Sequence, residues 1–494
     1  MSLYFEKMNL AFDNFGYWMF ILVIASILVA LLIANLLIQT IKPLKKALIP
    51  APVLGGFILL IFLSVFKKIT GAELYNTEVL EMITYHLLGI GFIATALKKK
   101  EKRDDEFKKK NSSGIFNSSL VTVSGYLIQA LVGLGVSVGL FFILKGQVWP
   151  ASGVLVPMGF GQGPGQALNW GKTYEEYTLA SSMFGSFADG KSFGLAIAAM
   201  GFIAASIGGI IYLNVERKKG NIKFTSRSEE VMEKNTLETY ETTNEIPTSG
   251  TIDKFTVQFA LVILVYLISF GLIMLCSKLC DNSGVKFLIN TVKPLLWGFN
   301  FIIGTGVAAL VRALMEKFEG AGAIKKRYIN NYQLDRIGGF SFDVMVVAAI
   351  ASINLEAFTK PEFIVPLLGM GVLATIASYI YIKFICKHLF EKDGYYEESF
   401  LCLFGMLTGT ASTGVILLRE IDPEFKTPAC NNMVFQTLYS IVLGAPVLLL
   451  MGTVGSGWNG LLLSVVVFAV YFVFINILVF RDKIFKKKKN KEGE

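Results

Sequence analysis

Long apolar stretches recur from one end of this 494-residue chain to the other. A helix needs roughly 20 apolar residues to cross the hydrocarbon core of a bilayer, and most of these stretches approach or exceed that length. Hydrophobic residues make up 53% of the chain, charged residues 17%, and the mean hydropathy is +0.58. These values exclude an ordinary soluble domain and predict an all-α polytopic membrane protein.

The apolar windows predict about eleven spans. They lie near residues 17–40, 52–66, 80–97, 116–144, 180–213, 254–277, 288–315, 338–357, 361–386, 428–452 and 457–480. Two further segments, 150–172 and 400–425, are equally apolar but are broken by Gly, Pro, Ser and Thr. Broken helices at membrane depth survive only where they are buried in protein or line a cavity. We therefore expect two re-entrant hairpins whose tips approach each other.

Basic residues collect on one side of this predicted topology, which explains the net charge of +9 without a nucleic-acid partner. With the N-terminus outside, the basic clusters follow helices 1, 3, 5, 7, 9 and 11. The clusters are Lys42, Lys45 and Lys46; Lys98 to Lys110; Arg217 to Lys219; Lys325 to Arg327; Lys383, Lys387 and Lys392; and Lys486 to Lys489. We expect a protein of the inner (plasma) membrane with a cytoplasmic C-terminus.

The order of features in the first half repeats in the second. Residues 1–213 and 254–452 each offer a Pro-containing helix start, a small-residue helix, a long helix and a broken hairpin, in opposite directions through the membrane. This pattern predicts two inverted five-helix repeats, a common plan of secondary transporters. Residues 214–253 are polar and form a cytoplasmic tether or, alternatively, a ligand-binding module. Residues 453–494 add one helix and a basic tail.

Four segments resemble landmarks of a known family, the bacterial sodium/glutamate symporters (glutamate:sodium symporter family). They are IPAPVLGG (49–56), GFGQGPGQALNWG (159–171), SFGLAIAAMGFIAASIGG (192–209) and LTGTASTGVILLREIDPEF (407–425), within a similarity that covers about residues 16–452. The resemblance implies a homodimer of two-domain subunits, alternating access, Na⁺ as coupling ion, and a small carboxylate such as glutamate as substrate. The chain departs from the family at Gln162, Pro164, Leu417 and Leu418.

The first hairpin has glycines that alternate around Pro164. Such a segment leaves backbone carbonyls free for Na⁺ and backbone amides free for a carboxylate, although a glycine-rich packing face is the alternative. Arg419, near the end of the second hairpin, either pairs with a substrate carboxylate or lies at the surface beside Asp422 or Glu424. The expected substrate-binding residues are Gly161, Gln162, Gly163, Gly165, Gln166, Asn169, Ser412, Thr413 and Arg419.

The second hairpin holds four hydroxyl residues between positions 408 and 414. Hydroxyl oxygens suit a hard cation such as Na⁺, but they can also bond the backbone of their own helix. Ionisable residues inside spans are usually functional, so Asp343 and Asp189 are candidates too, with pairing of Asp189 and Lys191 near an interface as the alternative. The expected cation-binding residues are Asp343, Thr408, Thr410 and Asp189.

Motifs of other protein classes are missing. The sequence has no Walker A motif and no cluster of His, Cys and carboxylate residues, so we expect neither an ATP-driven pump nor an enzyme, and no metal or cofactor beyond Na⁺. The leading hypothesis is Na⁺-coupled symport of glutamate or a related small carboxylate. A Na⁺- or H⁺-coupled carrier of another organic anion and a channel remain as alternatives.

Overall fold

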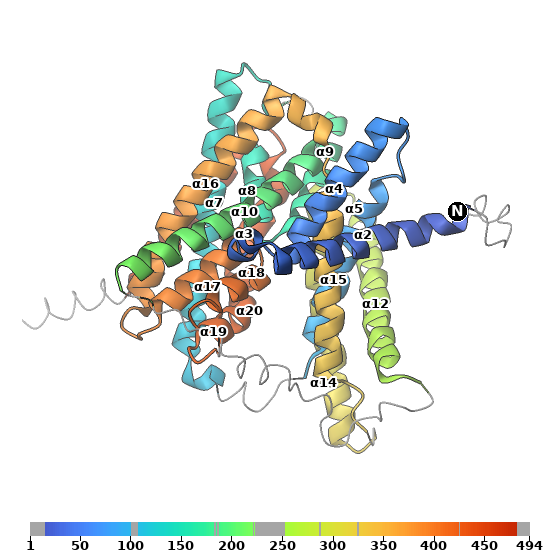
Figure 1. The fold of residues 1–494 in the computed structure, drawn as a ribbon, viewed down its shortest axis with the longest axis vertical. Helices are drawn as coiled ribbons and strands as arrows, with labels where there is room; N and C mark the ends of the chain where they lie inside the picture. The colour runs from blue at the N-terminus through green and yellow to red at the C-terminus, as the bar shows by residue number, and fades with distance from the viewer. Residues whose placement is uncertain are drawn as a thin grey trace, which may run out of the picture.

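A computed structural model gives the fold of residues 15–99, 107–181, 184, 187–220, 222, 252–285, 288–323, 326–423 and 425–481. Every regular element in this part of the chain is a helix (Figure 1). Eight helices are long and apolar enough to cross a membrane, or nine if a helix pair bent by 52° forms one span. The protein is therefore a polytopic helical membrane protein. Most of the predicted tether and Lys486 to Lys489 lie outside the described residues.

The helices of the first half are α2 (Phe15–Thr40), α3 (Lys42–Lys46), α4 (Ala51–Thr70), α5 (Glu78–Leu97), α7 (Ser112–Ile143), η1 (Ser152–Val154), α8 (Leu155–Phe160), α9 (Pro164–Ser181) and α10 (Gly190–Lys218). Those of the second half are α12 (Lys254–Asn282), η2 (Leu288–Val292), α13 (Lys293–Gly298), α14 (Asn300–Gly320), α15 (Asn331–Ala351), η3 (Leu355–Thr359), α16 (Pro361–Phe390), α17 (Tyr396–Thr408), α18 (Ala411–Leu418), α19 (Ala429–Phe435), α20 (Thr437–Val454) and α21 (Trp458–Val479).

Four predicted spans differ from the structure. The segment 428–452 is divided at Gln436 into α19 and α20, with a bend of 52° between them. The segment 288–315 is divided at Phe299 into η2, α13 and α14, and the segment 338–357 belongs to α15, which begins earlier. Charged residues interrupt both α14 and α15, so neither is among the candidate spans by length and composition. The predicted span 180–213 begins instead at Gly190, because the second arm of the first hairpin extends to Ser181.

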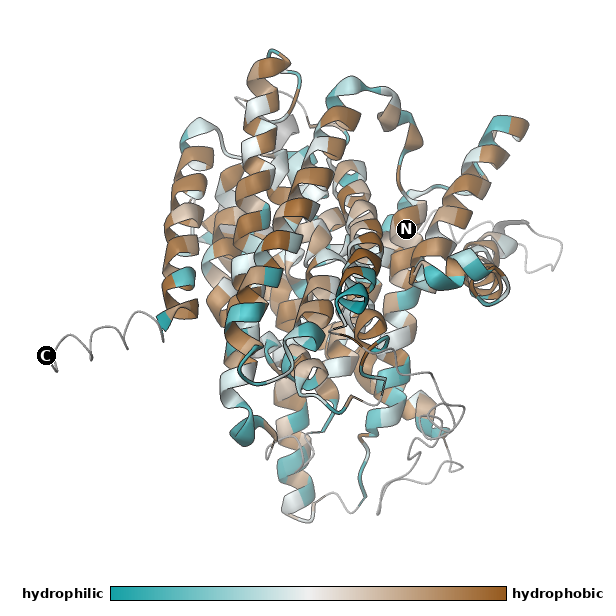
Figure 2. Ribbon diagram, turned by 60° about the vertical axis from the view of Figure 1, so that its left-hand side comes forward, coloured by the Kyte–Doolittle hydropathy of each residue, from teal (hydrophilic) through white to brown (hydrophobic). Residues whose placement is uncertain are grey.

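The helices pack as two groups. A frame group consists of α2, α4, α5 and α12 to α15, with buried side chains such as Ile93, Val265 and Leu334 between its helices. A hairpin group consists of α7 to α10 and α16 to α21, around a larger core that includes Phe160, Phe202 and Phe404. Apolar residues cover the middle of both groups, and polar residues gather at helix ends (Figure 2).

Packing within the frame group is mirrored between the two halves of the chain. Helix α4 packs on α15, and α14 packs on α5; α2 packs on α4, and α12 packs on α14. At the centre of this arrangement α5 packs on α15, and in the hairpin group α7 packs on α16. The packing of α2, α4 and α5 of the first half is thus repeated by α12, α14 and α15 of the second half.

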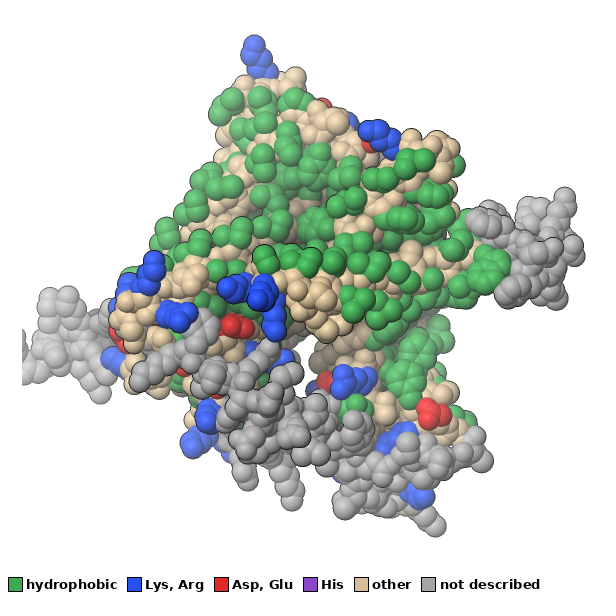
Figure 3. All heavy atoms as spheres, viewed as in Figure 1, with side chains coloured by type: hydrophobic (Ala, Val, Ile, Leu, Met, Phe, Trp, Pro, Cys, Tyr) green, Lys and Arg blue, Asp and Glu red, His purple; other side chains and the backbone are tan. Residues whose placement is uncertain are grey.

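Several helix ends meet on one side of the molecule, which we call the basic end. Lys98 at the end of α5 pairs with Asp335 of α15, and Lys383 near the end of α16 pairs with Glu216 of α10. Lys and Arg side chains gather along the lower and left-hand edge in Figure 3. The other side, where α5 and α10 begin, is called the opposite end.

Candidate functional site

The first predicted hairpin is broken between α8 and α9. Gly163 has a φ of +84°, which glycine adopts without strain, and this conformation lets α9 start in a new direction at Pro164. Gly161 lies so close to α7 that a β-carbon there would be 2.2 Å from Cε1 of Tyr126. The Tyr126 hydroxyl donates to the Gly161 carbonyl oxygen at 3.4 Å. Helix α7 therefore fixes the position of this break.

The second predicted hairpin is broken between α17 and α18, at Gly409 and Thr410. The Thr410 hydroxyl caps α18 by accepting from the Thr413 backbone amide at 3.4 Å. Gln129 of α7 donates from Nε2 to the Leu407 carbonyl oxygen at 2.8 Å and to Ser378 Oγ at 3.1 Å. This break is held by the same helix that holds the first.

The two breaks touch each other. A β-carbon built on Gly163 would lie 3.7 Å from Cγ2 of Thr410 and 4.0 Å from the Gly409 carbonyl oxygen. The predicted approach of the hairpin tips is therefore present in the structure. It brings the N-terminal ends of α9 and α18 together, and unsatisfied backbone amides at helix N-termini favour negative charge.

Buried amide side chains near the breaks lack partners in the described part of the chain. Gln166, in the first turn of α9, is 1% exposed, and neither of its polar side-chain atoms is hydrogen-bonded. Gln129 Oε1 is likewise buried without a partner. An unsatisfied buried polar atom costs about 1–3 kcal/mol, so a bound polar ligand or ion would be stabilised here. Asn169 is satisfied, because it donates to the Gly298 carbonyl oxygen at 3.1 Å.

The hydroxyl residues of the second hairpin do not converge on one point. Thr408 is buried and donates to the Phe404 carbonyl oxygen of its own helix at 2.7 Å. Thr413 is also buried, with its hydroxyl 3.3 Å from that of Thr410, whereas Ser412 is exposed. Leu417 and Leu418, two positions that depart from the resembled family, are fully buried in the core.

The ionisable candidates are spread over different surfaces. Arg419 is exposed, with its guanidinium 5.3 Å from the centre of the Phe425 ring. Asp422 accepts hydrogen bonds from Lys426 and Thr427. Glu424 lies outside the described residues. Asp189 pairs with Lys360 at 2.5 Å. Asp343 lies on an exposed strip of α15 together with Phe340.

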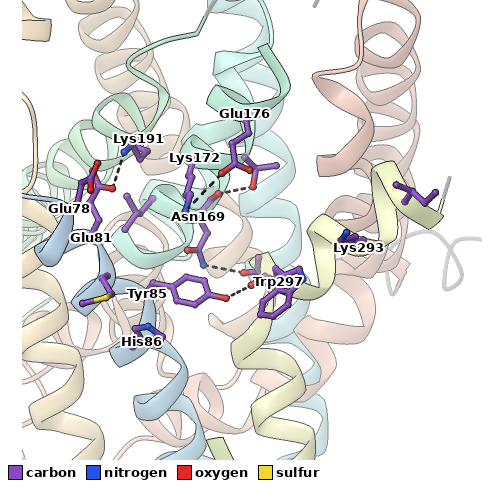
Figure 4. Close-up of a pocket in the computed structure, with 15 residues that line it drawn as sticks. Glu78, Glu81, Tyr85, His86, Asn169, Lys172, Glu176, Lys191, Lys293 and Trp297 are labelled. Atoms are coloured by element: carbon purple, nitrogen blue, oxygen red, sulfur yellow. Dashed lines mark hydrogen bonds and ion pairs between the residues drawn. The ribbon is translucent and has the colours of Figure 1, made fainter. Parts of the chain in front are cut away.

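A pocket of about 850 Å³ opens at the opposite end, between α5, α9, α10 and α13 (Figure 4). Lys191 Nζ lies 3.0 Å from Glu81 Oε2 and 3.9 Å from Glu175 Oε2, and the Lys191 backbone amide donates to Glu175 Oε1 at 2.8 Å. Burial raises the pKa of Glu175 to about 7, and the bonds from Lys191 oppose this shift. The lining also includes Tyr85, His86, Asn169, Lys172, Glu176 and Trp297.

Sequence reasoning missed several of these residues. Tyr126 and Gln129 are one helical turn apart in a long apolar helix, where a glutamine is costly and could have been noticed. Asp189 and Lys191 do form ion pairs, but in the described part of the chain their partners are Lys360 and Glu81 and not each other. Glu81 and Glu175 stand out only after folding, because their partner lies on another helix.

Fold and site define a class, a multi-pass helical membrane protein with two helix breaks in contact and a charged pocket beside them. No protein-family model matches the chain, and no curated protein matches it either.

Proposed function

We propose that this protein is a secondary active transporter that couples Na⁺ entry to symport of glutamate or a related small carboxylate by alternating access. The contact between the two helix breaks, at Gly163 and Thr410, carries the proposal. Broken helices that meet in pairs supply helix N-termini for an anion and free carbonyl oxygens for Na⁺. A continuous channel would not need such a pair.

The mirrored packing of α4 on α15 and of α14 on α5 supports two inverted repeats. In this proposal α14 and α15 also cross the membrane, α8–α9 and α17–α18 are the re-entrant hairpins, and eleven crossings put the basic end in the cytoplasm. Glu319 of α14 then faces protein, where it pairs with Lys99, whereas Asp343 remains on an exposed strip of α15. The N-terminus would be outside, and the membrane would be the plasma membrane.

The resemblance to sodium/glutamate symporters supplies the substrate class, the coupling ion and the homodimer. Local chemistry is compatible with them: the amide side chains of Gln166 and Gln129 are buried at the breaks, and the oxygens of Thr408, Thr410 and Thr413 lie on the second hairpin. Oxygen ligands match Na⁺ better than a transition metal. No cofactor and no catalysed reaction belong to this proposal.

Transport into proteoliposomes tests it. Purified protein would be reconstituted, and uptake of labelled glutamate, aspartate and dicarboxylates would be measured with a Na⁺ gradient, a proton gradient or neither. We expect uptake driven by Na⁺ and accelerated by unlabelled substrate on the other side, because only a carrier exchanges substrate in counterflow. Uptake driven by protons alone would support the related H⁺-coupled carrier, and flux without counterflow would contradict a carrier.

A further inference from the structure

The frame group and the hairpin group are joined by polar contacts at the opposite end. Lys191 of α10 pairs with Glu81 of α5, and Ser192 Oγ accepts from the Asn354 backbone amide at 3.1 Å. The main packing contacts between the groups include those of α9 with α5, α13 and α15. Beside the pocket, these contacts hold the arm of the first hairpin against the frame group.

The second helix break is more exposed than the first. Helix α18 packs mainly on α10, α17 and α19 of its own group, and Ala411 and Ser412 at its start are exposed. The second hairpin is thus accessible where the first is enclosed.

Lys191 of α10 contacts residues of two other helices at the opposite end. Its side chain is 26% exposed, those of Glu81 and Glu175 are 20% and 17% exposed, and the three groups come from α10, α5 and α9. Partly buried charges of this kind are costly to separate, because removal of one partner leaves another charge unpaired in a poorly hydrated site. Figure 4 shows Lys191 pointing toward Glu81 on one side of the residues that line the pocket.

We infer that the Lys191–Glu81 pair is a latch that holds α10 of the hairpin group against α5 of the frame group and keeps the pocket from deepening between them. The inference rests on the proposed function, in which the hairpin group moves against the frame group and each end opens in turn. The pair must break when the pocket deepens toward the hairpin breaks. Substrate from outside would then pass Lys191 on its way to Gly163.

Cysteine accessibility tests the latch without any need for substrate. The five native cysteines would be replaced, and Leu168, which lines the pocket and is 3% exposed, would be changed to Cys. A membrane-impermeant maleimide would be applied from the outside. We expect slow labelling in the background with the latch intact and severalfold faster labelling in Lys191→Glu and in Glu81→Lys. The double exchange Glu81→Lys with Lys191→Glu should return the rate most of the way.

Lys172→Glu is the matched control. It makes the same charge change in the same pocket, but Lys172 pairs only loosely, at 4.0 Å, with Glu176 on its own helix and links no two groups. Its labelling rate should equal that of the background. Equal rates in all variants would overturn the latch, as would a double exchange that labels as fast as the single variants.

Two further measurements separate the possible failures. Size-exclusion profiles and melting temperatures identify any variant that has simply lost its fold, in which case Lys191→Met and Glu81→Gln replace the exchanged charges with neutral side chains. Counterflow in the same proteoliposomes tests transport independently. If the labelling rates change as expected but the protein shows no counterflow, the latch stands and the transporter is rejected. If counterflow is present but the labelling rates do not change, only the latch is rejected.

Discussion

Tyr126 and Gln129 lie one turn apart on α7, and each holds the backbone of a different helix break. Tyr126 donates to the Gly161 carbonyl oxygen of the first hairpin, and Gln129 donates to the Leu407 carbonyl oxygen of the second. Because both donors sit on one rigid helix, the relative position of the two breaks is set by α7. A change at either residue should displace one break with respect to the other.

Replacement of Gln129 by Leu should destabilise the protein. The leucine removes both donated bonds in a site with no exposure and leaves the Leu407 carbonyl oxygen unsatisfied at a cost of about 1–3 kcal/mol, which the removal of the unpartnered Gln129 Oε1 offsets in part. Ser378→Ala is the milder control, since it removes only the shared hydroxyl. Thermal unfolding in detergent would rank the wild type above Ser378→Ala and Gln129→Leu lowest. A Gln129→Leu protein as stable as the wild type would mean that this bond does not position the second hairpin.

Gly163→Ala should impair transport more than its small size suggests. Space is not the obstacle, since the new methyl would meet Thr410 at an ordinary contact distance of 3.7 Å. The obstacle is the positive φ of +84°, because this conformation costs a residue with a β-carbon about 1–2 kcal/mol. Gly139→Ala on α7 is the control, as no atom lies within 4 Å of its added methyl group. Initial uptake rates normalised to reconstituted protein should fall for Gly163→Ala only; equal rates in the two variants would show that the turn at Gly163 tolerates a side chain.

The latch should weaken as the pH rises through about 7. Burial raises the pKa of Glu175 from an ordinary 4.5 to about 7. Lys191 lowers this pKa, and the negative charges of Glu81 and Asp189 raise it. When the pocket opens, water reaches Glu175 and its pKa falls, so the closed state binds more protons between those two values and low pH favours it. Labelling of Leu168→Cys should therefore be slower at pH 5.5 than at pH 8, after normalisation to unfolded protein at each pH.

Glu175→Gln provides the control for this pH effect. The amide cannot ionise, so its labelling rate should stay close to the low-pH rate of the parent at every pH. A pH dependence that persists in Glu175→Gln would assign the proton to another group.

The sequence predicts much of this architecture because hydropathy and turn residues are local signals. Both helix breaks can be located from Gly163, Pro164 and Gly409, and their contact agrees with the predicted approach of two hairpin tips. The predicted boundary between the first hairpin and α10 was wrong, because residues 172–190 are polar enough to belong to either segment. The Lys191–Glu81 pair could not be predicted, since it joins residues 110 positions apart whose charges look like ordinary helix ends.

The last prediction concerns the coupling of ion and substrate, for which Asp343 and Arg419 are the proposed charges. Asp343 is exposed on α15, and Arg419 is exposed at the end of α18, so both can be changed with little loss of stability. If Asp343 binds Na⁺, Asp343→Asn should weaken Na⁺ binding, and by linkage it should also weaken Na⁺-dependent substrate binding at subsaturating Na⁺. Arg419→Ala should remove substrate binding while Na⁺ still stabilises the protein.

Melting curves of both variants, with Na⁺ titrated in the presence and absence of glutamate, distinguish these roles, because a ligand that binds only the folded state raises the melting temperature. Replacement of NaCl by choline chloride controls for ionic strength. Asp335→Asn is the matched control for Asp343→Asn. It also removes a carboxylate from α15, and this carboxylate pairs with Lys98 at the basic end. If Asp343→Asn and Asp335→Asn respond to Na⁺ alike, the ion binds elsewhere, and the oxygens around Gln129 and Thr410 become the next candidates. If Arg419→Ala keeps its response to glutamate, Arg419 is a surface charge that stacks on Phe425.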